Sequence, residues 1–215
     1  MDIVDVMIDG ESLVYDYLCV INAVTITPLV KKQYLVDAPG ADGSKDLSSW
    51  FGAPRFESRT LKIYCQCASE PATDCADKMV SRWVGRTLDV VLSFDDMFYR
   101  TGMVTQVMPA GADSSDEIVI TILCEPCRYL CYEVINRIPT SAEAREYTWW
   151  NNGALDVLPT LTVPEDDVTL LMGTAKFTLT AGTFLLPELV IPGNSSITVT
   201  VSGGALEARY REAVR

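Results

Sequence analysis

The chain has 215 residues, enough for one large domain or two small ones that each bury a core. Its 29 acidic and 17 basic residues give a net charge of −12, the wrong sign for gripping phosphates, so we expect no stable nucleic-acid binding. Histidine, the side chain most often used as a general base near neutral pH, is absent, which weakens every enzymatic interpretation.

Targeting signals are also missing from the sequence. No apolar run approaches the roughly 20 residues that span a bilayer, so no membrane association is expected. The first residues, Met1-Asp-Ile-Val-Asp5, lack the basic flank of a signal peptide. We therefore expect synthesis in the cytoplasm, where the seven cysteines stay reduced.

Alternating and β-branched residues dominate the chain before residue 70 and predict strands. Between Val36 and Ser48, proline, glycine and aspartate interrupt the pattern and predict a long polar loop, because these residues favour turns over sheet ladders. Loops of about a dozen residues are usually functional or docked on another surface. The predicted strands are 3–8, 18–26, 31–36 and 61–67.

One helix is predicted, over residues 69–84. Pro71 falls in its first turn and Gly85 follows its end, which is the usual asymmetry of helix termini. Its apolar residues recur at i, i+3 and i+4 and form a stripe that we attribute to core packing. The stripe consists of Ala72, Cys75, Ala76, Met79, Val80 and Trp83.

A hairpin is expected after the helix, with strands 88–94 and 98–108 joined by a turn at Asp95-Asp96 that we interpret as solvated. A further strand, 117–124, ends before Pro126 because proline cannot donate to a ladder. Residues 1–133 are thus predicted to form a β-sandwich or barrel with one packed α-helix.

The composition changes near residue 134, beyond which there is no cysteine and no convincing helix. Seven short strands separated by turn residues predict an antiparallel β-sandwich over residues 134–215, so the whole chain is expected to be mainly β. The predicted strands are 145–149, 160–163, 168–171, 175–180, 188–191, 196–201 and 206–211.

Two cysteine pairs are candidate metal ligands. Cys65 and Cys67 point to one face of a predicted strand, and Cys124 and Cys127 have the spacing of zinc ligands. Together they complete a tetrahedron if the two strands lie side by side. The alternative, which we favour, is that these thiols are buried and pack as small hydrophobic groups, with no cofactor and no metal.

The adjacent tryptophans Trp149 and Trp150 are a candidate platform for a sugar. Neighbouring residues on a strand face opposite sides, however, so one of the two is expected in the core. No nucleophile with a base and no serine-lysine motif is present, and the chain is therefore not expected to be an enzyme.

Several fragments, taken in their order and spacing, resemble the distal tail proteins (Dit) of phages with long, non-contractile tails (siphophages). The resemblance covers nearly the whole chain, with departures at Ala41, where the family often has arginine, and in the compact second domain. It rests on segments 38–47, 59, 83–85, 94–102, 124–126, 151–159 and 191–197.

The resemblance implies a structural virion protein, a baseplate hub at the tip of the phage tail. The first domain would form a hexameric ring around a channel for DNA, and a galectin-like second domain would lie outside it as an attachment point. The implied partners are the tail tube protein, the tail-associated tip protein or lysin, and receptor-binding proteins. The resemblance does not identify the host or the receptor. It also leaves open whether the ring is single or doubled back to back, and whether the second domain binds glycan or protein.

In a closed ring, long loops and edge strands are shielded by neighbouring subunits. We therefore predict that the loop from residue 39 to 48 is ordered by a neighbour in the ring. A second hypothesis is that surplus carboxylates line the channel, where passing DNA meets like charge. The candidate interface residues are Pro39, Gly40, Asp42, Gly43, Asp46 and Leu47.

A rival interpretation from another class is a carbohydrate-binding protein, in which the second sandwich acts as a lectin. It predicts glycan binding that is lost when Trp149 or Trp150 is replaced, whereas the hub needs no such affinity. A wall hydrolase ranks third because catalytic groups are missing.

Overall fold

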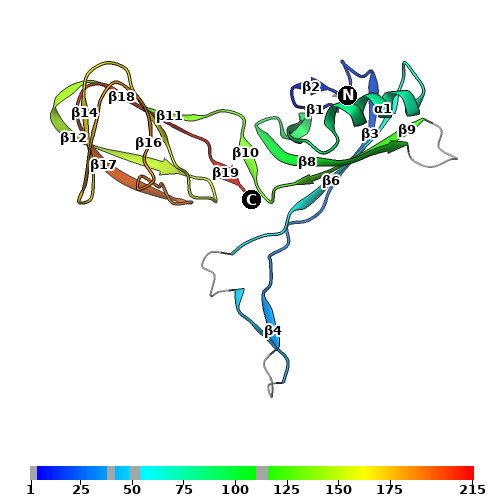
Figure 1. The fold of residues 1–215 in the computed structure, drawn as a ribbon, viewed down its shortest axis with the longest axis horizontal. Coiled ribbons are helices and arrows are strands. Elements are labelled where there is room, and N and C mark those ends of the chain that lie inside the picture. The colour runs from blue at the N-terminus through cyan, green and yellow to red at the C-terminus, as the bar shows by residue number, and fades with distance from the viewer. Residues whose placement is uncertain (1–3, 38–41, 49–53, 110–115) are drawn as a thin grey trace. The chain divides into compact units, whose positions relative to one another are not determined.

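The computed structural model describes residues 4–37, 42–48, 54–109 and 116–215. The fold is mainly β with one α-helix among these residues, as the sequence predicts (Figure 1). The chain divides into two compact units, residues 1–128 and 129–215, whereas the sequence analysis placed the boundary near residue 134. No helix in the described ranges is long and apolar enough to cross a membrane.

In the described part of the first unit, seven antiparallel strands follow one another in the order β2-β1-β7-β8-β9-β6-β3. Alternation along β9 buries Ile118, Ile120 and Ile122 on one face, which builds the core. The strands are β1 (Val6–Ile8), β2 (Glu11–Ser12), β3 (Cys19–Ile26), β6 (Arg59–Cys67), β7 (Thr87–Leu92), β8 (Phe98–Pro109) and β9 (Glu117–Cys124).

Helix α1 (Ala72–Trp83) packs against β6, β8 and β9 of this sheet (Figure 1). It begins three residues later than expected, because Pro71 has an extended ψ of 142° and precedes the first helical residue. The apolar stripe is confirmed except at Val80, which is 39% exposed. Val80 lies about 80° around the helix from Ala72, at the edge of the stripe.

Between β3 and β6 the chain forms a two-stranded arm, which consists of the described residues in 27–37 and 42–58. At its base the Thr27 N–H donates to the Thr60 carbonyl at 3.0 Å, and farther along the Glu57 N–H donates to the Val30 carbonyl at 2.9 Å. The arm contains the antiparallel pair β4 (Leu35–Asp37) and β5 (Ser44–Asp46).

The arm corrects two expectations. The segment 36–48 is not wholly a loop, because Lys45 pairs with Val36 in the β4–β5 ladder, and polar residues suffice where only backbone groups need partners. The strand expected over 31–36 is reduced to β4 and to an isolated bridge between Lys31 and Phe56.

The second unit is an antiparallel sandwich, as expected. Its described strands form two four-stranded sheets, β11-β18-β13-β16 and β12-β17-β14-β15, and Trp149, Leu161 and Val199 are among the core residues. The bounds of these eight strands are β11 (Val134–Ile138), β12 (Ser141–Asn151), β13 (Thr160–Val163), β14 (Val168–Met172), β15 (Ala175–Leu179), β16 (Gly182–Leu185), β17 (Ser195–Gly203) and β18 (Leu206–Tyr210). Outside these two sheets, β10 (Arg128–Leu130) pairs with β19 (Ala213–Val214).

One predicted strand of the sandwich, 188–191, is wrong: it contributes only an isolated bridge between Ile191 and Val157. The sheet instead contains β16, which begins at Gly182 in a stretch where the sequence predicts no strand. Gly182 pairs with Val163 at a φ of 148°, a backbone conformation that L side chains rarely adopt.

Candidate functional site

The arm exposes apolar side chains that the core does not cover. All six residues of β4 and β5 are exposed, and none of them joins a hydrophobic cluster. Leu35 is 56% exposed, and Val30 and Val36 are 48% exposed. A groove of about 690 Å³ lies on the arm, lined by Leu29, Val30, Lys31, Gln33, Leu35 and Glu57.

These features fit a surface that a partner covers. A lone two-stranded ladder is marginally stable in water, so contact with a second surface would stabilise the arm. Exposed apolar side chains gathered on one segment are typical of interaction sites. The sequence analysis did not name the apolar residues Val30 and Leu35 as candidate interface residues. Their position just before the polar loop was the one sign that could have identified them.

The structure describes four of the six candidate loop residues. Pro39 and Gly40 lie outside the described residues, and Asp42 is exposed. Gly43 is exposed as well and has a φ of 81°, which favours glycine.

The other two candidates close the arm by hydrogen bonds. The Leu47 N–H donates to the Tyr34 carbonyl at 2.8 Å. The Asp46 carboxylate accepts from the Ser48 hydroxyl and, at 2.8 Å, from the Ser48 N–H, and these bonds lower the pKa of Asp46. The polar residues thus shape the arm, while its apolar residues offer the contact area.

The arm continues from an exposed sheet edge. Strand β3 ends the strand order and pairs, within the described residues, with β6 alone. Val20 on β3 is 58% exposed. An eight-residue edge strand with unpaired backbone groups is a template for another chain.

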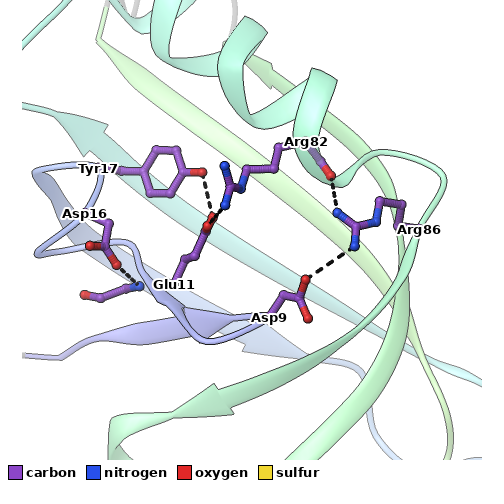
Figure 2. A network of polar contacts seen from close by, with 7 residues as sticks. Asp9, Glu11, Asp16, Tyr17, Arg82 and Arg86 are labelled. Carbon is purple, nitrogen blue, oxygen red and sulfur yellow. Dashed lines mark hydrogen bonds and ion pairs between the residues drawn. The ribbon is translucent and has the colours of Figure 1, made fainter.

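A polar network ties the β1–β2 turn to the end of helix α1 (Figure 2). Glu11 accepts a hydrogen bond from the Tyr17 hydroxyl at 3.0 Å and forms an ion pair with Arg82. Arg86 donates to the Arg82 carbonyl at 3.0 Å and lies 3.4 Å from the Asp9 carboxylate. Because the arginines are more than half exposed, each ion pair adds little stability, and the network mainly orients the turn.

Tyr17 is a partly buried member of this network. Burial, together with the hydrogen bond to Glu11 and the charge of Glu11, raises the pKa of Tyr17. Its ring lies 4.9 Å from that of Trp83. An open hollow of about 870 Å³ beside it is lined by Gly10, Glu11, Asp16, Tyr17, Lys78, Ser81 and Arg82. The mixed charges of this lining do not define a catalytic set.

The Asp95 turn is not simply solvated, contrary to expectation. Its carboxylate lies 3.0 Å from Arg100 and 2.6 Å from Arg128, and the Arg128 guanidinium stacks 4.2 Å from the centre of the Phe98 ring. The Arg100 side chain is only 8% exposed, and burial lowers its pKa despite the nearby carboxylate. This cluster fixes the β7–β8 connection.

The candidate four-cysteine site, which we did not favour, does not form. Strands β6 and β9 are neighbours, as the zinc hypothesis required, but their antiparallel register pairs Cys65 with Ile118 and places Cys124 opposite Arg59, at the other end. Cys124 is buried, and burial raises its pKa to about 11, so it behaves as a packed thiol.

A different cysteine group comes together instead. The sulfur atoms of Cys19, Cys67 and Cys75 all lie within 4.8 Å of one another. Among the described residues it is the group whose ligand atoms are close enough to hold a metal ion. Motif spacing could not reveal this group, because the three residues lie on three different elements.

The two tryptophans face opposite sides of β12, as expected. Trp149 is 1% exposed and belongs to the core, whereas Trp150 is 60% exposed. A sugar could therefore contact the ring of Trp150 but not that of Trp149.

Comparison with known proteins shows a likeness to a solved structure. No protein-family model matches the chain, and no curated protein matches its sequence. Among solved structures, the chain is similar to SPP1 Dit (gp 19.1), described as a paradigm of the hub adsorption apparatus in phages that infect Gram-positive bacteria. The TM-score is 0.68 at 13% identity, and the match covers 100% of both chains. The chain therefore has the fold of a phage Dit protein.

Proposed function

We propose that the chain is a distal tail protein of a siphophage, a structural hub of the virion without enzymatic activity. The observation that carries this proposal is the fold likeness to SPP1 Dit, because it spans both units and both chains in full. A likeness confined to one β-sandwich would say little, since such folds serve many functions.

The proposed assembly is a six-membered ring around a channel for DNA. The first unit forms the ring, and the exposed arm and the free edge of β3 are covered by neighbouring subunits. The second unit, a galectin-like sandwich, is the attachment point for receptor-binding proteins. The ring joins the tail tube protein to the tail-associated tip protein.

The net charge of −12 supports the DNA channel. A lumen that carries surplus carboxylates repels the phosphates of passing DNA, so the strand slides without being held. A high-resolution map of the ring with a neutral or basic lumen would remove this part of the proposal.

Electron microscopy of the purified full-length chain tests the assembly. We expect six-fold rings with a central pore and, by mass photometry, a mass six times that of the chain. A chain that stays monomeric at high concentration, with or without the tail tube and tip proteins, contradicts the proposal.

One observation favours the carbohydrate-binding alternative, namely the exposed ring of Trp150 on β12. If the second unit is a lectin, the full-length chain binds cell-wall glycans on an array, and Trp150→Ala abolishes this binding while the ring assembles normally. Absence of glycan binding by the intact ring leaves the hub as a purely structural element.

A further inference from the structure

Three elements that are far apart in the sequence bring their cysteines to one place. Cys19 begins β3, Cys67 ends β6, and Cys75 lies near the start of α1. The register of β3 and β6 places Cys19 directly opposite Cys67, and α1 packs against β6, which brings in the third sulfur. The cluster is therefore fixed by sheet register and helix docking.

The spacing of the sulfur atoms suits a single metal ion. All three lie within 4.8 Å of one another. Zinc–sulfur bonds of about 2.3 Å in tetrahedral geometry set the sulfurs about 3.8 Å apart, so closure needs shifts of about 1 Å or less. Side-chain rotations of that size require no change in the backbone.

A further polar group lies beside the cluster. The Ser69 hydroxyl is 3.5 Å from the Cys67 sulfur, within reach of an ion held by the three sulfurs. Thiolate is the form of cysteine that binds metals, so binding requires the thiols to lose their protons.

The exposure of the three thiols is graded. Cys19 is 2% and Cys75 is 0% exposed, whereas Cys67 is partly exposed. An ion can therefore enter beside Cys67 and be held in a largely dry site. The Cys19 and Cys67 thiols each donate a hydrogen bond to the Tyr17 carbonyl oxygen at 3.6 Å, and metal binding exchanges these weak bonds for bonds to the ion.

We propose that Cys19, Cys67 and Cys75 bind one thiophilic metal ion, Zn(II) or Cu(I), which clips helix α1 to strands β3 and β6. Each thiol that coordinates releases its proton to solvent, so three thiolates require the loss of up to three protons. Cu(I) is satisfied by the three sulfurs, whereas Zn(II) takes the Ser69 hydroxyl or a water as its fourth ligand.

Metal titration of the reduced, chelator-treated full-length chain tests the site. Cd(II) serves as a spectroscopic probe, since thiolate ligation produces a charge-transfer band in the near ultraviolet. We expect one ion per chain by native mass spectrometry, and displacement of Cd(II) by Zn(II) or by Cu(I) identifies the preferred ion. No charge-transfer band, or binding at several ions per chain, overturns the proposal.

Variants separate the cluster from the other thiols. Cys67→Ser, at the partly exposed position, and Cys75→Ser should each weaken Cd(II) binding by about a hundredfold or more, because even outer-sphere changes cost 10- to 100-fold. Cys131→Ser, at an exposed cysteine outside the cluster, is the matched control and should bind normally. Unchanged binding in Cys67→Ser contradicts the assignment.

Two further readouts keep the test decisive. Circular dichroism shows whether Cys75→Ser is folded; if it is not, the result rests on Cys67→Ser. Air oxidation of the metal-free chain, followed by mass spectrometry, detects a disulfide as a loss of two hydrogens. A disulfide between two of the three cysteines that forms even with metal in excess identifies a redox pair and overturns metal binding.

Discussion

Leu35 offers a direct test of the arm as an assembly surface. Its side chain is 56% exposed on β4. Full burial of a leucine contributes about 1.5–3 kcal/mol, so covering the exposed half in an interface contributes about 1 kcal/mol. Leu35→Ala should therefore weaken each subunit contact about fivefold.

Closure of a ring multiplies this effect. In the proposed six-membered ring the six identical contacts compound, and the concentration at which half of the chains are assembled should rise about sevenfold. Sedimentation velocity over a dilution series measures this midpoint. The thermal unfolding of dilute, unassembled chain should stay unchanged, because Leu35 contributes nothing to either hydrophobic cluster.

Leu185 supplies the matched control. It is 60% exposed on β16 of the second unit, so Leu185→Ala removes the same atoms from an equally exposed site. We expect its assembly midpoint to match that of the unmodified chain. Equal midpoints for Leu35→Ala and the unmodified chain would refute the role of the arm; a shift with both variants would point to a general loss of solubility.

Three other changes test the physical reading of the fold. Asp95→Asn leaves the buried Arg100 guanidinium without its charged partner and should lower the free energy of unfolding, measured in urea, by about 2–4 kcal/mol. The control Lys176→Gln, at an exposed position of β15, should leave it almost unchanged. Gly203→Ala, at a φ of 101° with a new Cβ 2.3 Å from the Asp167 oxygen, should cost about 2–4 kcal/mol, while Gly173→Ala, which meets no atom, should cost about 1–2 kcal/mol by the same assay. The folded pKa of Asp46 is lowered, so the ionised carboxylate stabilises the arm above its ordinary pKa of 3.8, and this contribution is lost as the pH falls through the lower folded value. Carboxyl-carbon NMR of Asp46 should show a titration midpoint below 3.8. Ser48→Ala should return that midpoint toward 3.8.

Regular periodicity explains which elements were predictable. Helix α1 and strands such as β9 could be predicted because each buries one face, which imposes an apolar repeat of 3.6 residues on a helix and of 2 residues on a strand. Strand β5 carries no such repeat, since its residues Ser44–Asp46 are all exposed and pair through the backbone alone. Elements that bury no side chains leave no pattern to read.

The candidate site was predictable only in part. The turn residues around Gly43 signalled the tip of the arm, but the exposure of Leu35 depends on what the rest of the chain fails to cover. The cysteine cluster depends on the β3–β6 register, and a shift of one residue would turn Cys19 to the other face. The spacing of Cys124 and Cys127 suggested a zinc site shared with Cys65, but the fold places Cys124 and Cys65 toward opposite ends of the β6–β9 ladder.

The pairing of β3 with β6 has a mechanical consequence. The ladder runs from Cys19 opposite Cys67 to Ile26 opposite Leu61, and the same two strands continue through Thr27 and Thr60 into the arm. A pull on the arm along its length draws the paired strands β3 and β6 in the same direction, so the load falls on the ladder between β6 and β9. That ladder runs from Arg59 opposite Cys124 to Gln66 opposite Glu117, and its hydrogen bonds are sheared together instead of being opened one at a time. An arm anchored in this way can carry tension without being pulled out of the sheet.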